Sequence, residues 1–315
     1  MQSLCKVAPQ EDGIALREVE PREPGPGEML LKAAAAGICG TDMQIYKWAP
    51  RMARRMQLPR VLGHEASGVV ESVGAGVTRV KPGDHVTLES HIFCGECLQC
   101  RTGRAHLCVN TGYPGIDIDG GFAPWLVAPA SIAWVNPPTL SHQTAAMLEP
   151  FGIAVHASLE GSGVSGQTVL VNGCGPIGLM NVAAARQLGA RKIIAADLNP
   201  LRLALAAKLG ADRVVNAATE SLADAVKDFS GGRGVDVGIE YSGSEAGFRA
   251  VYESLSKGGD FRLVGAPPEA IAVDFTFWLQ KCPRMINIHG RRIWDTWAVS
   301  TALVRSEEHT SELQS

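Results

Sequence analysis

The stretch TVLVNGCGPIG, residues 168–178, sets the architecture that we expect for the chain. Its first five residues form a short apolar run, and the pattern G-x-G-x-x-G follows at Gly173, Gly175 and Gly178. Glycines at this spacing allow a tight turn between a strand and a helix, and they let backbone N–H groups approach a pyrophosphate at the N-terminus of that helix. The stretch therefore predicts the strand, turn and helix of a dinucleotide-binding unit.

Beyond this turn, helical and extended patterns alternate along the chain. A helical stretch runs to Leu188, a strand covers residues 192–196, and a second helical stretch ends at Gly210. Further strand candidates at residues 235–240 and 260–264 flank a helical pattern near residues 245–257. Alternation of this kind predicts a parallel sheet with right-handed crossovers.

The strand that follows the glycine turn ends in Asp197, 19 residues after Gly178. A carboxylate at this place can accept hydrogen bonds from the adenosine ribose hydroxyls, and its charge would repel a 2′-phosphate. NAD is therefore the expected cofactor, in preference to NADP. The alternative is a packing turn followed by a solvated aspartate, which leaves the combination of strand, turn, helix and acid unexplained.

Residues 1–150 have a different texture. They contain many glycines and prolines, with short apolar runs such as residues 29–36 and 68–73 between turn signals. This pattern predicts an irregular, β-rich domain.

Four of the eight cysteines lie close together, at Cys94, Cys97, Cys100 and Cys108. In a long chain this spacing predicts a metal site in preference to disulfides, because four thiolates can close tetrahedrally on one ion. Such a site leaves no position for substrate, so a zinc ion there would be structural. An iron–sulfur cluster is the alternative, although ferredoxin-type sequences space their cysteines and proline differently.

A second constellation combines Cys39, in GICGTD, with His64 and Glu65, in GHE-x2-G-x5-G. Taken singly, each residue fits an ordinary core or surface role. Taken together, a sulfur, a nitrogen and an oxygen ligand leave one coordination position of zinc for an alcohol oxygen, whose acidity the cation raises. We therefore predict a catalytic zinc site.

Composition excludes several classes of function. The 315 residues carry a formal net charge of −3, with 46% hydrophobic and 19% charged residues, so there is no basic surplus for binding nucleic acid. Neither a signal-peptide core nor a run of about 18 apolar residues is present, so neither secretion nor membrane insertion is expected. We expect a cytoplasmic protein that acts on a small molecule.

Residues 305–315, RSEEHTSELQS, resemble a translated sequencing adapter. We expect an artefactual tail here and a natural C-terminal segment that is missing after residue 304. The polypeptide would then be a fragment. Whether it folds and is active is a separate question from the function of its gene. A polar disordered tail is the alternative.

The motif GHE-x2-G-x5-G, the four-cysteine loop and the glycine turn, in that order, resemble those of zinc-containing medium-chain dehydrogenases. The resemblance covers residues 1–304 and implies an α/β fold class. A GroES-like β-rich catalytic domain would span residues 1–150, and a Rossmann NAD-binding domain with a doubly wound parallel sheet residues 151–290. Residues 291–304 would begin the return to the catalytic domain. The resemblance also implies two zinc ions per subunit and a homotetramer.

The resemblance assigns a role to individual residues. Cys39, His64 and Glu65 match the ligands of the catalytic zinc, and the four clustered cysteines match those of the structural zinc. Glu149 matches an acidic residue beside the catalytic zinc, Thr41 the hydroxyl that relays the substrate proton, and His91 a residue of the substrate pocket, with an ordinary loop histidine as the alternative. The positions that match NAD contacts are Gly173, Gly175, Ile177, Gly178, Asp197, Arg202, Val264, Gly265, Ala266, Ile288 and His289.

One position departs from the family pattern. The family's proton relay commonly continues to a histidine three residues after the threonine, where this chain has Gln44. Glutamine cannot carry a proton by titrating, so the proton must leave by another route.

Within the family, the stretches at residues 38–48, 90–111, 149–156 and 289–297 resemble the members that oxidise L-threonine. The implied reaction is the oxidation of L-threonine at C3 to 2-amino-3-oxobutanoate, with hydride transfer to NAD. Oxidation of a polyol or diol such as sorbitol, idonate or 2,3-butanediol is the alternative, because pocket details decide the substrate. A non-catalytic dinucleotide-binding relative is a further alternative, but it would have no use for an open zinc site.

Overall fold

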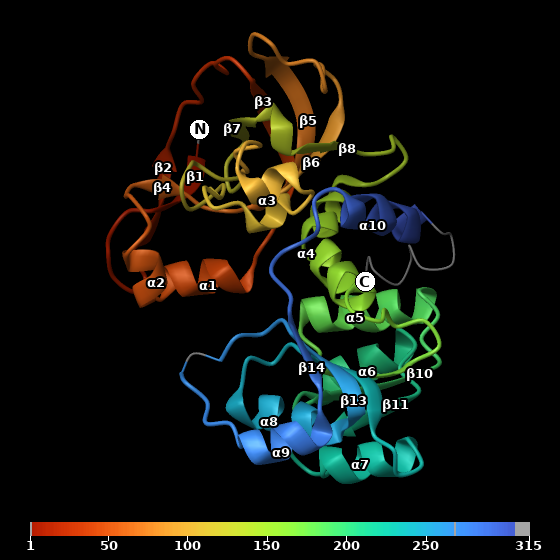
Figure 1. Ribbon diagram of the computed structural model, residues 1–315. Coiled ribbons are helices and arrows are strands. Elements are labelled where there is room, and N and C mark those ends of the chain that lie inside the picture. Colours follow the sequence, from red (N-terminus) through yellow and green to blue (C-terminus); the bar gives the residue numbers. More distant parts are fainter. Residues whose placement is uncertain (1, 268, 306–315) are drawn as a thin grey trace. The chain divides into compact units, whose positions relative to one another are not determined.

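The computed structural model describes residues 2–267 and 269–305, so most of the tail expected at 305–315 lies outside the described residues. The described chain forms two compact units (Figure 1). Unit 1 contains residues 2–150 and Arg292–Thr301, and unit 2 contains Phe151–Arg291 and residues 302–305. The short segment Arg292–Thr301 therefore folds with the N-terminal residues, although it follows unit 2 in the sequence.

Unit 2 is built on a six-stranded parallel sheet with the order β11-β10-β9-β12-β13-β14 in the described residues. Its strands are β9 (Thr168–Asn172), β10 (Lys192–Asp197), β11 (Arg213–Asn216), β12 (Val235–Glu240), β13 (Leu255–Leu263) and β14 (Arg284–Asn287). Its helices are α5 (Pro176–Gln187), α6 (Pro200–Lys208), α7 (Leu222–Phe229), α8 (Glu245–Ser254) and α9 (Phe275–Lys281), with α4 (His142–Leu159) entering from unit 1.

Successive residues of the central strands point to opposite faces of this sheet. Val169 and Val171 pack with residues of α4, α5 and α6, whereas Leu170 packs with residues of α7 and α8. Strand β10 alternates in the same way. A sheet covered by helices on both faces needs strands that are apolar throughout, which is why TVLVN contains so little polarity.

The structure confirms the predicted α/β fold class with its parallel sheet, and it corrects one element. The helical pattern near residues 245–257 ends at Ser254, where the chain becomes extended and β13 begins. Leu255 is buried and pairs with Val235 of β12, so this residue belongs to strand β13 and not to the helix. Tertiary pairing outweighs local helical preference here.

Unit 1 is mainly antiparallel. A five-stranded sheet has the order β7-β3-β5-β6-β8, and a three-stranded sheet has the order β2-β1-β4, both within the described residues. The strands are β1 (Gln2–Lys6), β2 (Ile14–Glu18), β3 (Glu28–Gly37), β4 (Arg60–Val61), β5 (Glu65–Val73), β6 (His85–Leu88), β7 (Trp125–Pro129) and β8 (Ala133–Val135). The helices are α1 (Gly40–Tyr46), α2 (Pro50–Ala53) and α3 (Leu98–Arg101), with two 3-10 turns, Ala105–Leu107 and Ala130–Ile132. Helix α10 (Asp295–Arg305) belongs to this unit up to Thr301.

The larger sheet of unit 1 encloses its own apolar core. Met29 and Leu31 of β3, Val70 of β5 and Leu88 of β6 are fully or almost fully buried in it. Among the described residues, none of the helices has the length and apolar character needed to span a lipid bilayer.

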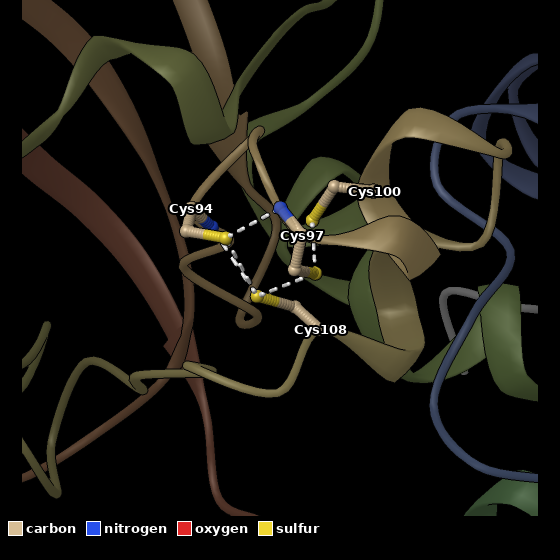
Figure 2. Close-up of side chains that lie close together, drawn as sticks. All are labelled: Cys94, Cys97, Cys100 and Cys108. Carbon is tan, nitrogen blue, oxygen red and sulfur yellow. Dashed lines mark hydrogen bonds between the residues drawn. The ribbon is translucent and has the colours of Figure 1, made fainter.

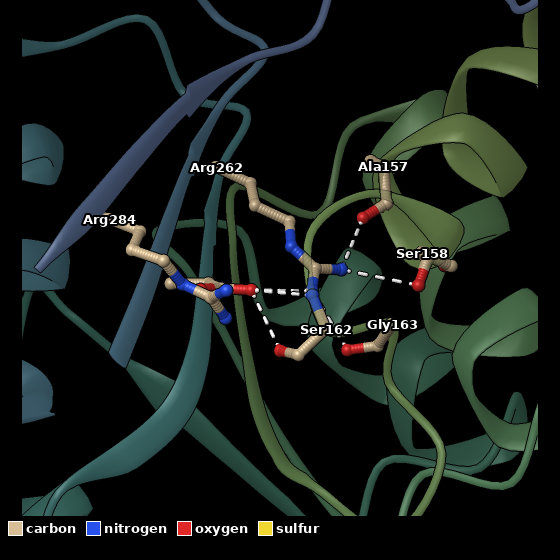
Figure 3. A network of polar contacts seen from close by, with 7 residues as sticks. Ala157, Ser158, Ser162, Gly163, Arg262 and Arg284 are labelled. Atoms are coloured by element: carbon tan, nitrogen blue, oxygen red, sulfur yellow. Dashed lines mark hydrogen bonds and ion pairs between the residues drawn. The ribbon is translucent and has the colours of Figure 1, made fainter. Parts of the chain in front are cut away.

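A buried ion-pair network connects three elements of unit 2 (Figure 3). Asp260 and Arg262 of β13 are fully buried and lie 3.1 Å apart. Arg262 also donates hydrogen bonds to carbonyl groups at the C-terminal end of α4 and in the following turn, including those of Ala157 and Gly163. Burial alone would raise the pKa of Asp260, but hydrogen bonds from Ser162 and Arg262 outweigh it and hold that pKa below its ordinary value. The network thus supplies the partners that a helix end requires.

We predict that Arg262→Ala destabilises the protein by about 3–5 kcal/mol, because it leaves a buried carboxylate and several carbonyl groups without their partner. Arg284→Ala is the matched control, since Arg284 pairs with the same carboxylate at 2.6 Å but is itself 59% exposed. Its removal should cost about 1 kcal/mol or less. Urea unfolding followed by circular dichroism measures both losses, and equal losses would contradict a special role for the buried guanidinium.

Candidate active site and cofactor cavity

Three strands of the larger unit 1 sheet bring the candidate ligands together. In the antiparallel ladders, Gly37 at the end of β3 is level with Glu65 at the start of β5, and Ser67 of β5 is level with Thr87 of β6. The C-terminal ends of β3 and β6 therefore meet the N-terminal end of β5 at one edge of the sheet. Cys39 follows β3 by two residues and His64 immediately precedes β5, so both arrive at this edge.

Cys39, His64 and Glu65 form one compact group. One potential ligand atom from each lies within 4.8 Å of the others, and His64 and Glu65 are buried. Glycine provides the space for this group, because a Cβ atom on Gly37 would lie 2.2 Å from the Glu65 Oε2 atom. Gly63, before His64, has a φ of +93° and packs against the ring of Phe122, a position that favours glycine.

The group concentrates negative charge in a buried place. Burial raises the pKa of the Cys39 thiol to about 12, and the nearby carboxylates of Glu65 and Glu149 add to the effect. Burial likewise raises the pKa of Asp42, with Glu149 contributing in the same direction. A divalent cation would reverse these shifts, because a thiolate ligand is stabilised by the ion that it binds. Cation uptake would therefore release a proton and weaken as the pH falls.

The polar atoms behind the group also fit a bound zinc ion. Asp42 Oδ1 and His64 Nδ1 are buried, have no hydrogen-bond partner in the described part of the chain, and lie 3.9 Å apart. A histidine that binds zinc through Nε2 normally donates its Nδ1–H to a carboxylate, and a shift of less than about 1 Å would make that bond here. The sequence motifs assign no role to Asp42. The sequence could have indicated it by its position three residues after Cys39. There it caps α1 by accepting from the Cys39 N–H at 2.8 Å.

Thr41, Gln44 and His91 are further residues of unit 1 that the sequence indicated. Thr41 is in the first turn of α1, and its backbone and side chain both contact the Cys39 sulfur. Gln44, on the same helix, is exposed. His91 lies just beyond β6 and is buried, with its Nδ1 atom 2.6 Å from the Glu89 carboxylate. No sequence motif indicates Glu89.

The four clustered cysteines converge on a common centre (Figure 2). Sulfur–sulfur distances are 3.5 Å for Cys97–Cys100 and Cys94–Cys108, and 3.9 Å for Cys97–Cys108. Four sulfurs arranged tetrahedrally at the usual zinc–sulfur distance would be about 3.8 Å apart, which is close to the observed distances. Backbone N–H groups also point at the sulfurs, for example from Cys97 to Cys94 at 3.4 Å. Such bonds favour thiolates.

The glycine turn of unit 2 has the predicted form. Gly173 follows β9 with a φ of +94°, and Gly175 is the N-cap residue of α5. A Cβ atom on Gly178 would lie 1.9 Å from the carbonyl oxygen of Gly173, so only glycine allows this close packing of helix and turn. The turn lies where the strand order reverses between β9 and β12, the usual position of a nucleotide in such sheets.

A cavity of about 890 Å³ opens beside this turn. Its lining includes Gly173, Gly175, Asp197 and Arg202, all predicted cofactor positions. The Asp197 carboxylate accepts from the Cys174 N–H at 2.7 Å and lies 3.9 Å from the Arg202 guanidinium, so the turn and the acid hold one another in place. The remaining predicted positions are Ile177 in α5, the loop after β13 at Val264, Gly265 and Ala266, and the residues after β14, Ile288 and His289.

The cavity also contains residues that the sequence pattern did not indicate. Tyr241 and Ser242 line it directly after β12. The signal was available, because a strand neighbouring β9 in a parallel sheet must end at the same edge.

Comparisons with known proteins agree with this geometry. Residues 25–138 match the alcohol dehydrogenase GroES-like domain, and residues 176–306 match the zinc-binding dehydrogenase family. The chain belongs to the zinc-binding alcohol dehydrogenases of the medium-chain type, as its motifs predicted.

Among curated proteins, the L-threonine 3-dehydrogenase of Pyrococcus abyssi is 39% identical over 307 residues, which is 97% of this chain and 88% of that protein. Among solved structures, galactitol-1-phosphate dehydrogenase from Escherichia coli has a TM-score of 0.90 at 25% identity, covering 98% of this chain and 90% of its own. A protein of E. coli CFT073 described as a short chain alcohol dehydrogenase, solved with NADH, has a TM-score of 0.88 at 29% identity, covering 97% and 88%.

We predict that Gly37→Ala prevents zinc from binding to the group of Cys39, His64 and Glu65, because the new Cβ atom would displace the Glu65 carboxylate. Gly40→Ala is the matched control, since a Cβ atom there meets nothing within 4 Å. Mass spectrometry of bound metal should find about half the zinc of the unchanged protein in Gly37→Ala and an unchanged amount in the control. Full zinc occupancy in Gly37→Ala would contradict the prediction that this glycine makes room for the ligand group.

Proposed function

We propose that this protein oxidises L-threonine at C3 to 2-amino-3-oxobutanoate and reduces NAD. The carrying observation is the compact group of Cys39, His64 and Glu65, which offers an open zinc site at a sheet edge. The support for threonine is the 39% identity to the L-threonine 3-dehydrogenase of P. abyssi along nearly the whole chain.

In this proposal, Cys39, His64 and Glu65 hold a catalytic zinc ion, and Cys94, Cys97, Cys100 and Cys108 hold a structural one. When bound, the catalytic zinc supplies Lewis-acid polarisation of the substrate oxygen. Asp42 then fixes the ring of His64, because its Oδ1 atom faces Nδ1 across 3.9 Å. The four-cysteine site braces its loop and takes no part in the chemistry.

Proton removal falls to Thr41. Its hydroxyl lies against the Cys39 sulfur at the start of α1, so it is placed to accept the proton of the C3 hydroxyl. The exposed side chain of Gln44 cannot titrate, so in this chain the proton passes on to solvent. The negative charge of Glu149 acts on both Cys39 and Asp42. It makes the site more negative and so favours a divalent cation. His91 lines the alcohol-binding pocket.

The cofactor binds in unit 2, with the pyrophosphate at the Gly173–Gly178 turn and the adenosine ribose at Asp197. When bound, the nicotinamide supplies the hydride acceptor. The exposed Arg202 side chain, 51% accessible, is free to turn from Asp197 toward the cofactor.

A diol or polyol dehydrogenase is the second candidate, favoured by the TM-score of 0.90 to galactitol-1-phosphate dehydrogenase. The homotetramer that the family resemblance implies and the cytoplasmic location that the sequence predicts stay predictions.

We predict NADH formation with L-threonine and little with sorbitol or 2,3-butanediol, measured by absorbance. Cys39→Ser should lower the rate by about 100-fold or more, because a hydroxyl replaces a thiolate ligand. Activity on the diols alone would reassign the substrate. Absence of activity on all three, from folded and zinc-loaded protein, would refute the proposed reaction.

We predict that Asp197→Asn lowers the ratio of kcat/KM with NAD to kcat/KM with NADP by about tenfold or more, equivalent to about 1.4 kcal/mol. The amide oxygen can still accept from the Cys174 N–H, but the acceptor for the Asn199 N–H and the charge that repels a 2′-phosphate are removed. Asp228→Asn is the control, because Asp228 pairs with Arg213 at 2.8 Å and does not line the cavity. An unchanged ratio in Asp197→Asn would mean that another residue selects the cofactor.

A further inference from the structure

The carboxylate of Glu240 is buried behind one wall of the cofactor cavity. Glu240 is the last residue of β12, is fully buried, and lies level with Asn172, the last residue of β9. Its Oε2 atom accepts from Asn172 Nδ2 at 2.5 Å, and its Oε1 atom accepts from the Ser242 hydroxyl and, at 3.0 Å, from the Gly243 N–H. A buried carboxylate is costly unless such donors surround it.

These donors fit the ionised form of Glu240. The Gly243 N–H and the Asn172 amide nitrogen can only donate, and they act on different oxygens of the carboxylate, so both oxygens serve as acceptors. Burial raises the pKa of Glu240, and the hydrogen bonds from these donors and from Ser242 oppose that rise.

The segment that Glu240 holds, residues 241–244, forms part of the cavity wall. Its lining residues are Tyr241, Ser242 and Ser244. The segment is packed between glycines, because a Cβ atom on Gly173 would lie 2.7 Å from the Ser242 backbone nitrogen, and one on Gly247 of α8 would lie 2.7 Å from Asn172 Nδ2. The wall therefore touches the turn at which we expect the pyrophosphate.

The carboxylate also sets the direction of the hydrogen bonds along this wall. Because an ionised carboxylate only accepts, the Ser242 hydroxyl must donate to Glu240. Ser242 Oγ lies 2.9 Å from Ser244 Oγ, and with its own hydrogen already used it can only accept there. The Ser244 hydroxyl therefore donates to Ser242.

This order leaves Ser244 Oγ with an acceptor position. Its hydrogen points to Ser242, and one of its two lone pairs accepts from the Gly247 N–H at 2.9 Å. Ser244 is exposed and lines the cavity, where the described residues provide no further donor to this oxygen. A hydroxyl or amino group of a nucleotide could donate to it, whereas a phosphate oxygen could not.

We propose that Glu240 is a positioning residue for the dinucleotide. It fixes the hydroxyls of Ser242 and Ser244 so that Ser244 Oγ accepts a hydrogen bond from a hydroxyl or amino group of the bound nucleotide. The proposal rests on the part of the proposed function that places NAD in this cavity. It gives a buried carboxylate, which does not itself line the cavity, a part in cofactor affinity.

The test measures the dissociation constant of NADH by fluorescence titration of the whole protein, without an alcohol substrate. Glu240→Gln should raise this constant about tenfold, because an amide must turn a donor toward Asn172 or toward Ser242. Ser242→Ala leaves the buried carboxylate in place and breaks only the chain of hydroxyls. It should raise the constant about fivefold, and so should Ser244→Ala.

Asp236→Asn is the matched control. Asp236 belongs to the same strand as Glu240, but it accepts from the Thr168 N–H at 2.8 Å, at the opposite end of β9, and does not line the cavity. The control should bind NADH like the unchanged protein. A loss of affinity equal to that of Glu240→Gln would mean that any change in this strand weakens binding, and would overturn the positioning role.

A double variant separates the ordering of hydroxyls from a general loss of stability. In a Ser244→Ala background, Glu240→Gln should raise the dissociation constant of NADH by no more than about twofold, because the acceptor that Glu240 positions is already gone. A full tenfold effect in that background would overturn the proposal.

NADH binding needs no alcohol, so its outcomes separate the two proposals. If Glu240→Gln weakens NADH binding but the unchanged protein does not oxidise L-threonine, the proposed substrate fails while the positioning by Glu240 stands. If L-threonine is oxidised but Glu240→Gln and Ser242→Ala bind NADH like the unchanged protein, the positioning role fails while the proposed function stands. Folded protein that binds no NADH would overturn both.

Discussion

The antiparallel register of β3, β5 and β6 holds the candidate site of unit 1 in place. Backbone hydrogen bonds fix Gly37 level with Glu65, and Ser67 level with Thr87. The chain leaves β3, enters β5 and leaves β6 at one edge, where a Cβ atom on Gly37 would lie 2.2 Å from the Glu65 Oε2 atom. The proposed ligands therefore sit on the ends of paired strands, which position side chains more accurately than loops.

This arrangement places several acidic groups close together in a buried site, which favours the binding of a cation. Cys39, Asp42, Glu65 and Glu149 all act on one small buried volume, and burial disfavours the charged form of the Cys39 thiol and of Asp42. A zinc ion bound there would turn that repulsion into attraction. In unit 2, the buried negative charge of Asp260 is balanced by the guanidinium of Arg262 instead of a metal ion. That guanidinium also donates hydrogen bonds to backbone carbonyls.

Local patterns predicted the parts of the fold that depend on local chemistry. The strand TVLVN coincides with β9, and the glycine turn has the positive φ at Gly173 that its role requires. The prediction failed where long-range pairing competes with local preference, as at Leu255, whose pairing with Val235 ends α8 early. Strand β14 and helix α9 were not predicted, because they are short and carry few buried residues.

The amino-acid sequence by itself determined the family, the order of its motifs and the chemical types of the candidate ligands. These depend on the spacing and chemistry of residues that are close together in the sequence. Only the tertiary structure decided which distant groups meet. Asp42 faces His64 because α1 and β5 start at the same sheet edge, and Trp297 reaches Glu89 because Arg292–Thr301 folds with unit 1. Contacts across 208 positions follow from strand pairing and burial in three dimensions, and no local pattern encodes them.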